Sequence, residues 1–196
     1  MTYKREPKKG PVAQPGQSDR LITCWSPVQI RAGPPKASLR TDYLKREYPT
    51  QPVAGVGAVI MHDGKILLVK RGSEPGKGKW SIPGGIVELG ETTKETTVRE
   101  VKEETSLDVE VGELIDIVDN LETDEKGRLR YHFIILDYLA SLKRGSLKAG
   151  SDIIEAKWVP LVQVEKFDLT RTFREFFERN RQILQHASGR SLEDLS

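Results

Sequence analysis

The chain has 196 residues, of which 37% are hydrophobic and 31% charged, so it is long enough to bury one good hydrophobic core. No apolar run is long enough to cross a membrane, and the start of the chain lacks the apolar segment of a signal peptide, so a membrane-spanning or secreted protein is not expected. The lone Cys24 cannot form an internal disulfide. We therefore expect a soluble, cytoplasmic protein with one domain.

The net charge of +2 is unevenly distributed, because residues 1–49 contain ten Lys or Arg and only four Asp or Glu. This basic segment contains Pro and Gly and has no hydrophobic period, so we expect it to be disordered or loosely attached. A basic arm that binds nucleic acid electrostatically is one interpretation, and the less favoured one. The other is a translation start placed too far upstream. Residues 21–23 and 28–30 resemble a transfer-RNA gene read in frame, with the true start near Leu39 or Leu44.

The ordered domain is expected to begin near residue 50 with a strand over residues 53–61 and its hairpin partner over residues 66–71. Residues 72–79 form a Gly-rich loop with Lys77 and Lys79. Loops of this composition are often merely flexible, but this one leads into a Pro-Gly-Gly turn, where positive charge could hold an anionic substrate. Arg71, at the end of the second strand, is the better candidate for a phosphate contact, and Lys79 is the second.

A helix is predicted after that turn, because Thr92 and Glu95 have the spacing of a capping box. On this helix Glu100, Glu103 and Glu104 share one face. Like charges at this spacing destabilise an isolated helix by about a few tenths of a kcal/mol per pair, so the arrangement needs a compensating cation. Hard oxygen ligands favour Mg²⁺, with Mn²⁺ as the other candidate, over zinc. The alternative is a solvated charged face with no ligand.

Strands follow over residues 108–111, 114–118, 129–140 and 151–159, and a last helix over residues 167–184 carries Phe173, Phe176, Phe177, Ile183 and Leu184 as a core-facing stripe. No second His or Cys lies at ligand spacing from a histidine, so we assign no role to His62, His132 or His186. This order of elements predicts an α/β protein with a mixed sheet covered by helices.

The segment from Gly85 to Leu107 resembles the Nudix box, and the matching positions are Gly85, Glu91, Arg99, Glu100, Val101, Glu103, Glu104 and Leu107. Ser106 stands where the family has Gly; a left-handed backbone there costs a residue with a Cβ about 1 kcal/mol or more. The resemblance spans residues 51–185. It implies a Nudix-type α/β/α sandwich whose catalytic helix follows the Pro-Gly-Gly turn, with a domain over residues 50–185 and a polar tail over residues 186–196.

The resemblance also implies the site. Glu100 and Glu104 are expected as primary metal ligands, Glu103 as ligand to a further metal or a support, and Gly84 as a ligand through its carbonyl oxygen. Arg99 is suited to orient Glu100 by a bidentate pair, with Glu91 as a further support. The general base in this family often lies outside the box; the candidates, each with the alternative of being a solvated loop acid, are Asp152 and Glu155, followed by Glu122 and Glu125.

The implied reaction is metal-dependent hydrolysis of a nucleoside diphosphate linked to another group, since a divalent cation neutralises phosphate oxygens and lowers the pKa of a water. The arrangement of Gly55, Gly57 and residues 78–85, 131–132 and 151–158 resembles the ADP-ribose pyrophosphatase branch. Trp80 and Tyr131 could stack on a base, although core packing is the favoured role for both. Other hypotheses are a nucleoside triphosphate pyrophosphohydrolase that cleans the nucleotide pool and a non-catalytic nucleotide-binding regulatory module. The family often forms dimers, so a homodimer is one open assembly state.

Overall fold

The computed structural model describes residues 46–150 and 152–188. These residues fall within a single unit of the chain. Predictions about residues 1–45, including disorder, nucleic-acid binding and the upstream start, lie outside the described residues, as do those about residues 189–196. No helix in the described part of the chain has both the length and the apolar character needed to span a membrane.

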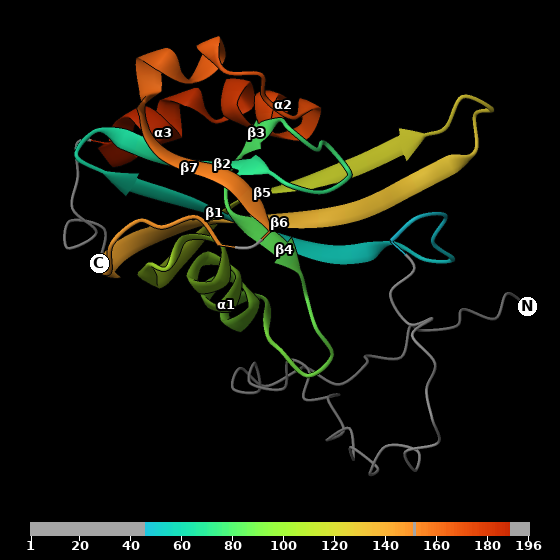
Figure 1. Ribbon diagram of the computed structural model, residues 1–196, viewed down its shortest axis with the longest axis horizontal. Coiled ribbons are helices and arrows are strands. Elements are labelled where there is room, and N and C mark those ends of the chain that lie inside the picture. The colour runs from blue at the N-terminus through green and yellow to red at the C-terminus, as the bar shows by residue number, and fades with distance from the viewer. Residues whose placement is uncertain (1–45, 151, 189–196) are drawn as a thin grey trace, which may run out of the picture. The chain divides into compact units, whose positions relative to one another are not determined.

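A seven-stranded mixed sheet forms the centre of the fold (Figure 1). Its main path runs β3 (Trp80–Ser81), β2 (Lys65–Arg71), β1 (Val53–His62), β6 (Leu129–Arg144) and β5 (Asp108–Thr123). Two further strands, β4 (Gly84–Ile86) and β7 (Ile153–Pro160), pair with β1 and β2. The β1–β6 pair is parallel and the other pairs are antiparallel, which confirms the predicted mixed sheet.

The β1–β2 hairpin lies where the sequence predicts it. Asp63 and Gly64 both have positive φ, 47° and 70°, which is the backbone that a two-residue hairpin turn of the favoured hand requires. The two strands predicted over residues 108–118 are wrong as separate elements, because β5 is continuous over 16 residues. Its pairing with β6 is irregular between Val111 and Leu114, where the sequence pattern is interrupted.

Alternating residues of the central strands form two hydrophobic clusters, one on each face of the sheet. One cluster includes Val59 and Leu68 and packs against the C-terminal helices; the other includes Ala58 and Leu67 and packs against α1 (Thr93–Thr105). Figure 1 shows α1 on one side of the sheet and the C-terminal helices on the other, so the predicted α/β/α layering is confirmed.

Helix α1 begins and ends as its sequence predicts. The Thr92 side chain accepts a hydrogen bond from the Glu95 amide while the Glu95 carboxylate accepts one from the Thr92 amide, which completes the capping box. Ser106 adopts the left-handed conformation, with φ 62° and ψ 13°, so the turn forms without the family's glycine. Val98 is 41% exposed, whereas Thr96, Thr97, Val101 and Thr105 are buried.

The single helix predicted over residues 167–184 is wrong. The chain forms a 3₁₀ helix (Leu161–Lys166), then α2 (Arg171–Arg179) and α3 (Arg181–Ser188). The Thr170 side chain accepts a hydrogen bond from the Phe173 amide and so starts α2 after the 3₁₀ helix. Phe173, Phe176, Phe177 and Leu184 are buried as predicted, but Ile183 is 48% exposed.

Candidate active site

A cleft of about 710 Å³ lies where β4 and α1 meet the loop after β2. One wall consists of residues from β4 and α1, including Gly85, Glu100 and Glu104. A second part of the lining comes from one face of β5 and β6 and from the start of α2, and residues 71–77 and Lys79 also line the cleft. The predicted acidic helix therefore faces the same cavity as the predicted basic loop.

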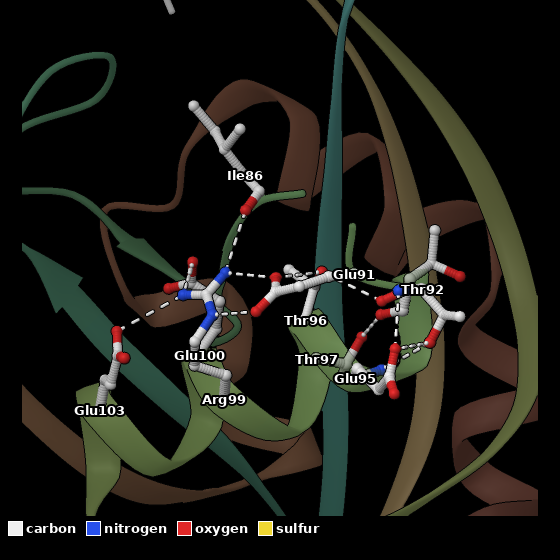
Figure 2. A network of polar contacts seen from close by, with 10 residues as sticks. Ile86, Glu91, Thr92, Glu95, Thr96, Thr97, Arg99, Glu100 and Glu103 are labelled. Atoms are coloured by element: carbon white, nitrogen blue, oxygen red, sulfur yellow. Dashed lines mark hydrogen bonds and ion pairs between the residues drawn. The ribbon is translucent and has the colours of Figure 1, made fainter. Parts of the chain in front are cut away.

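Arg99 is the centre of a network of polar contacts on α1 (Figure 2). Its Nε and Nη2 donate to the two carboxylate oxygens of Glu91 at 2.8 and 2.9 Å, and its Nη1 donates to Glu100 Oε1 at 2.9 Å. Nη1 also reaches Glu103 at 3.5 Å, and Nη2 donates to the Ile86 carbonyl at 3.2 Å. The prediction of a bidentate pair with Glu100 is therefore wrong. The Arg99 guanidinium forms its bidentate pair with Glu91, and Glu100 accepts one hydrogen bond.

The Glu91 carboxylate is the anchor of this network. The Arg99 and Thr96 hydrogen bonds lower the pKa of Glu91 to about 2, so it stays ionised across the physiological range. The Thr96 hydroxyl donates to Glu91 Oε2 at 2.8 Å. Glu91 lies in the turn before α1, so it joins that turn to the helix and fixes the guanidinium that contacts Glu100.

Glu100 lies directly over the Pro-Gly-Gly turn. A Cβ on Gly85 would overlap the Glu100 carboxylate, so only glycine lets the turn and the helix approach this closely. Burial raises the pKa of Glu100, and the hydrogen bond from Arg99 opposes that shift. The Glu100 carboxylate is thus partly buried, and the hydrogen bond from Arg99 offsets only part of the cost of burying its charge.

Glu104 is the most desolvated carboxylate of the helix. Burial raises its pKa to about 7, even though the Gly84 amide donates a hydrogen bond to Glu104 Oε2 at 3.0 Å. The described contact of Gly84 is thus through its amide; a role for its carbonyl oxygen stays a prediction.

A divalent cation fits this donor set. Within residues 46–150 and 152–188, no three acidic, histidine or cysteine side chains are placed to hold one ion, because Arg99 draws Glu100 and Glu103 toward itself. The oxygens are nevertheless those that Mg²⁺ prefers, and the buried charge of Glu104 lacks a full counter-ion. Glu103 is 60% exposed, so its side chain can turn without breaking core contacts.

Cationic side chains lie on the cleft beside these carboxylates. Arg71 and Lys79 line it as predicted, and Arg71 Nε donates to the Pro75 carbonyl at 2.8 Å. Burial lowers the pKa of Arg71, while the charge of Glu104 opposes that shift. Arg46 also lines the cleft and acts electrostatically on both Arg71 and Glu100. Sequence reasoning missed Arg46 because it lies in the segment assigned to the N-terminal extension.

The position of Arg46 follows from the contacts of the next two residues. The Tyr48 amide donates to the Arg130 carbonyl at 2.7 Å, and Glu47 accepts hydrogen bonds from the Tyr131 hydroxyl at 2.6 Å and from Arg130 at 2.7 Å. These contacts attach residues 46–48 to the start of β6. The sequence offers no periodic signal for this attachment.

Two of the four candidate general bases line the cleft and two do not. Asp152 and Glu122 line the cleft, whereas Glu155 and Glu125 do not. Glu155 lies in β7 and its carboxylate pairs with Lys157 Nζ at 2.6 Å. These positions favour Asp152 over Glu155 as the candidate base.

Trp80 and Tyr131 do not line the cleft, and both have the core packing that is favoured from the sequence over stacking on a base. Trp80 is 7% exposed and packs edge-on against Phe167, with ring centroids 5.1 Å apart. Tyr131 is 3% exposed and stacks on Phe133 at 6.0 Å. Both are core aromatics, because each lies on a strand face that neighbouring elements cover.

Comparison with known proteins gives the family. The pattern of the NUDIX domain matches residues 51–179, so the chain belongs to the Nudix family and is a Nudix hydrolase, a member of a pyrophosphohydrolase family that typically uses divalent metals. The chain is 36% identical to an ADP-ribose pyrophosphatase of Methanocaldococcus jannaschii over 70% of this chain and 80% of that protein.

Solved structures agree with this assignment. A MutT protein from Methanosarcina mazei is 30% identical with a TM-score of 0.59, over 68% of this chain and 96% of that one. The NUDIX domain of Shewanella oneidensis NrtR, solved with ADP-ribose, is 25% identical with a TM-score of 0.56, over 69% of this chain and 90% of that one. Among sequence relatives, a Bacillus subtilis protein described as a putative ADP-ribose pyrophosphatase is 30% identical, and the match covers 53% of its length.

Proposed function

We propose that this enzyme hydrolyses the pyrophosphate linkage of ADP-ribose to give AMP and ribose 5-phosphate, with Mg²⁺ or Mn²⁺ as its cofactor. The observation that carries the proposal is the buried, under-compensated carboxylate of Glu104, which faces a cleft together with Glu100 and Arg71. Negative charge for a cation and positive charge for phosphates thus line one cavity. The similarity to an ADP-ribose pyrophosphatase supports the choice of substrate.

Glu100 and Glu104 would hold the cation, with Glu103 as a further ligand once it turns from Arg99. A bound divalent cation supplies neutralisation of the phosphate oxygens and a lowered pKa for water. Arg99 holds Glu100 in place, and Glu91 holds Arg99. These residues position the cation ligands and do not touch the substrate.

Arg71, Arg46 and Lys79 bind the anionic diphosphate at the rim of the cleft. Asp152 takes the proton from the attacking water at its carboxylate. Water adds to one phosphorus, the bridging oxygen leaves with the other phosphate, and two phosphate monoesters result. The chemistry needs no covalent intermediate on the protein.

The test is incubation of the purified protein with Mg²⁺ and a panel of ADP-ribose, NADH, dinucleoside polyphosphates and oxidised dGTP, with identification of the products. We expect AMP and ribose 5-phosphate from ADP-ribose at the highest kcat/KM. Preferred release of pyrophosphate from oxidised dGTP would favour the nucleotide-pool enzyme, which the similarity to MutT proteins makes the second candidate. Binding of ADP-ribose without turnover of any member would favour a regulatory module.

A further inference from the structure

One part of the cleft lining is a mostly apolar surface made by one face of the sheet. Phe133, Ile135 and Asp137 alternate along β6, so all three side chains lie on this face. Gly55 and Gly57 of β1 are their neighbours, opposite Ile135 and Asp137. Because Gly57 has no side chain, the carboxylate of Asp137 and the side chain of Ile82 come close to the β1 backbone.

The remaining groups of this wall complete a slot. Phe173 comes from the first turn of α2, and Val118 from β5 lies opposite Ile135. Ile82, after β3, closes the apolar border. Two aromatic rings and three aliphatic side chains suit the flat, apolar faces of a nucleobase.

Asp137 is the one acidic side chain buried at the base of this slot among the described residues. It is 4% exposed, and a Cβ on Gly57 would overlap its carboxylate. Within the described part of the chain, its side chain makes no hydrogen bond or ion pair. A carboxyl that lines a cavity and has no such partner among the described residues is available to hydrogen-bond a polar group of a ligand.

The charged groups around Asp137 come from β5 and α2. Asp116 lies opposite it on β5, where Arg179 donates at 2.8 Å and Asn180 at 2.6 Å to Asp116. Burial, then the charge of Asp116, raise the pKa of Asp137 to about 7, and Arg179 opposes them. Farther along the same wall, Glu122 faces the cleft, and Arg171 is held by Glu175, Asn120 and the Leu121 carbonyl.

We propose that Asp137 is a specificity-determining residue that binds the Watson–Crick edge of the substrate's nucleobase. The proposal rests on the proposed function, because it assigns the base end of the same substrate. The neutral carboxyl donates its O–H to adenine N1 and accepts a hydrogen bond from the adenine N6 amine at its carbonyl oxygen. The diphosphate then extends toward Arg71 and the acids of α1.

The protonation state of Asp137 determines which base it prefers. An ionised carboxylate only accepts, so it loses the hydrogen bond to adenine N1 but can accept from both the N1–H and the N2 amine of guanine. The neutral acid pairs acceptably with either base. The adenine-to-guanine preference of this enzyme therefore falls as pH rises through the range in which Asp137 loses its proton.

The test is the ratio of kcat/KM for ADP-ribose to that for GDP-ribose, measured from about pH 5.5 to about pH 8.5. Both substrates share the diphosphate and the cation, so titration of Glu104 cancels in the ratio. We expect the ratio to fall about tenfold or more in the wild type. In Asp137→Asn, whose amide keeps one donor and one acceptor, the ratio should stay flat at the wild-type acid value.

Asp137→Leu should lose affinity for both bases, and Glu125→Gln, an acid away from the cleft, should behave as wild type. The affinities for AMP and GMP, measured by calorimetry at the same pH values, give the ratio without turnover. A pH-independent ratio in the wild type, or unchanged base preference in both Asp137 variants, overturns the assignment. Absence of turnover with the expected pattern of AMP and GMP binding would refute the proposed function and leave the base site standing.

Discussion

The two walls of the cleft are built in different ways. On α1, Arg99 joins Glu91, Glu100 and Glu103 through contacts within one short segment of chain. On the sheet wall, Asp137 owes its surroundings to β1 and β5, which pair with β6 from distant parts of the sequence. On α1 the carboxylates are stabilised by hydrogen bonds from Arg99, whereas burial raises the pKa of Asp137 on the sheet. The first wall is suited to position a cation, and the second to sense what occupies the slot.

The largest effect is expected from Glu104→Gln. The amide keeps the shape of the side chain and removes the negative charge, so kcat should fall by about two orders of magnitude or more while the fold is preserved. Steady-state kinetics and circular dichroism measure the two effects. Glu125→Gln is the matched control. Near-normal activity of Glu104→Gln would contradict the assignment of Glu104 as a cation ligand.

The next largest effect is expected when the two candidate general bases, Asp152 and Glu155, are replaced one at a time. Asp152→Asn should reduce kcat about 10²-fold or more, because general base catalysis contributes on that order. Glu155→Gln should change kcat little, since Glu155 pairs with Lys157 outside the cleft. The reverse order of the two variants would mean that β7 contributes the base.

Arg99→Lys tests the network on α1. Lysine keeps the charge but cannot form the fork that holds Glu91 while contacting Glu100, so we expect a loss of about 10- to 100-fold in Mg²⁺ affinity or kcat/KM. Measuring the rate as a function of Mg²⁺ concentration distinguishes a loss of Mg²⁺ affinity from a loss of kcat/KM. If added Mg²⁺ restores none of the activity and the affinity is unchanged, Arg99 does not act through the ligands.

Asp137→Asn should stabilise the protein in a pH-dependent way. A carboxyl whose folded-state pKa, about 7, lies above its reference value of 3.8 takes up a proton on folding, so it costs stability as pH rises between those values. At pH 8 the unfolding free energy of the variant should exceed that of the wild type by about 1–3 kcal/mol, so the variant should unfold at a higher temperature. This difference should vanish below about pH 4. Equal stability at all pH values would mean that Asp137 is not desolvated.

Tyr131→Phe is expected to have the smallest effect. It removes the hydrogen bond from the hydroxyl to Glu47 and leaves the stack on Phe133, which predicts a loss of about 1 kcal/mol of unfolding free energy. KM for ADP-ribose should not change, because Tyr131 lies outside the cleft. A large rise in KM would instead support the alternative role of stacking on a base.

The parts of this protein that could be predicted from the sequence are those set by local spacing. The capping box at Thr92, the β1–β2 hairpin and the shared face of Glu100 and Glu104 all depend on residues a few positions apart. The place of Glu155 outside the cleft could not be predicted, because the face of a strand is decided by the elements packed on it. Asp137 was missed for the same reason, since its glycine neighbour comes from β1.

The most direct test of the central claim is anomalous diffraction from crystals soaked in Mn²⁺. The account predicts a peak in contact with the carboxylates of Glu100 and Glu104, with Glu103 turned away from Arg99 toward the ion. Absence of a peak at saturating Mn²⁺, with the contacts of Arg99 to Glu100 and Glu103 unchanged, would contradict it.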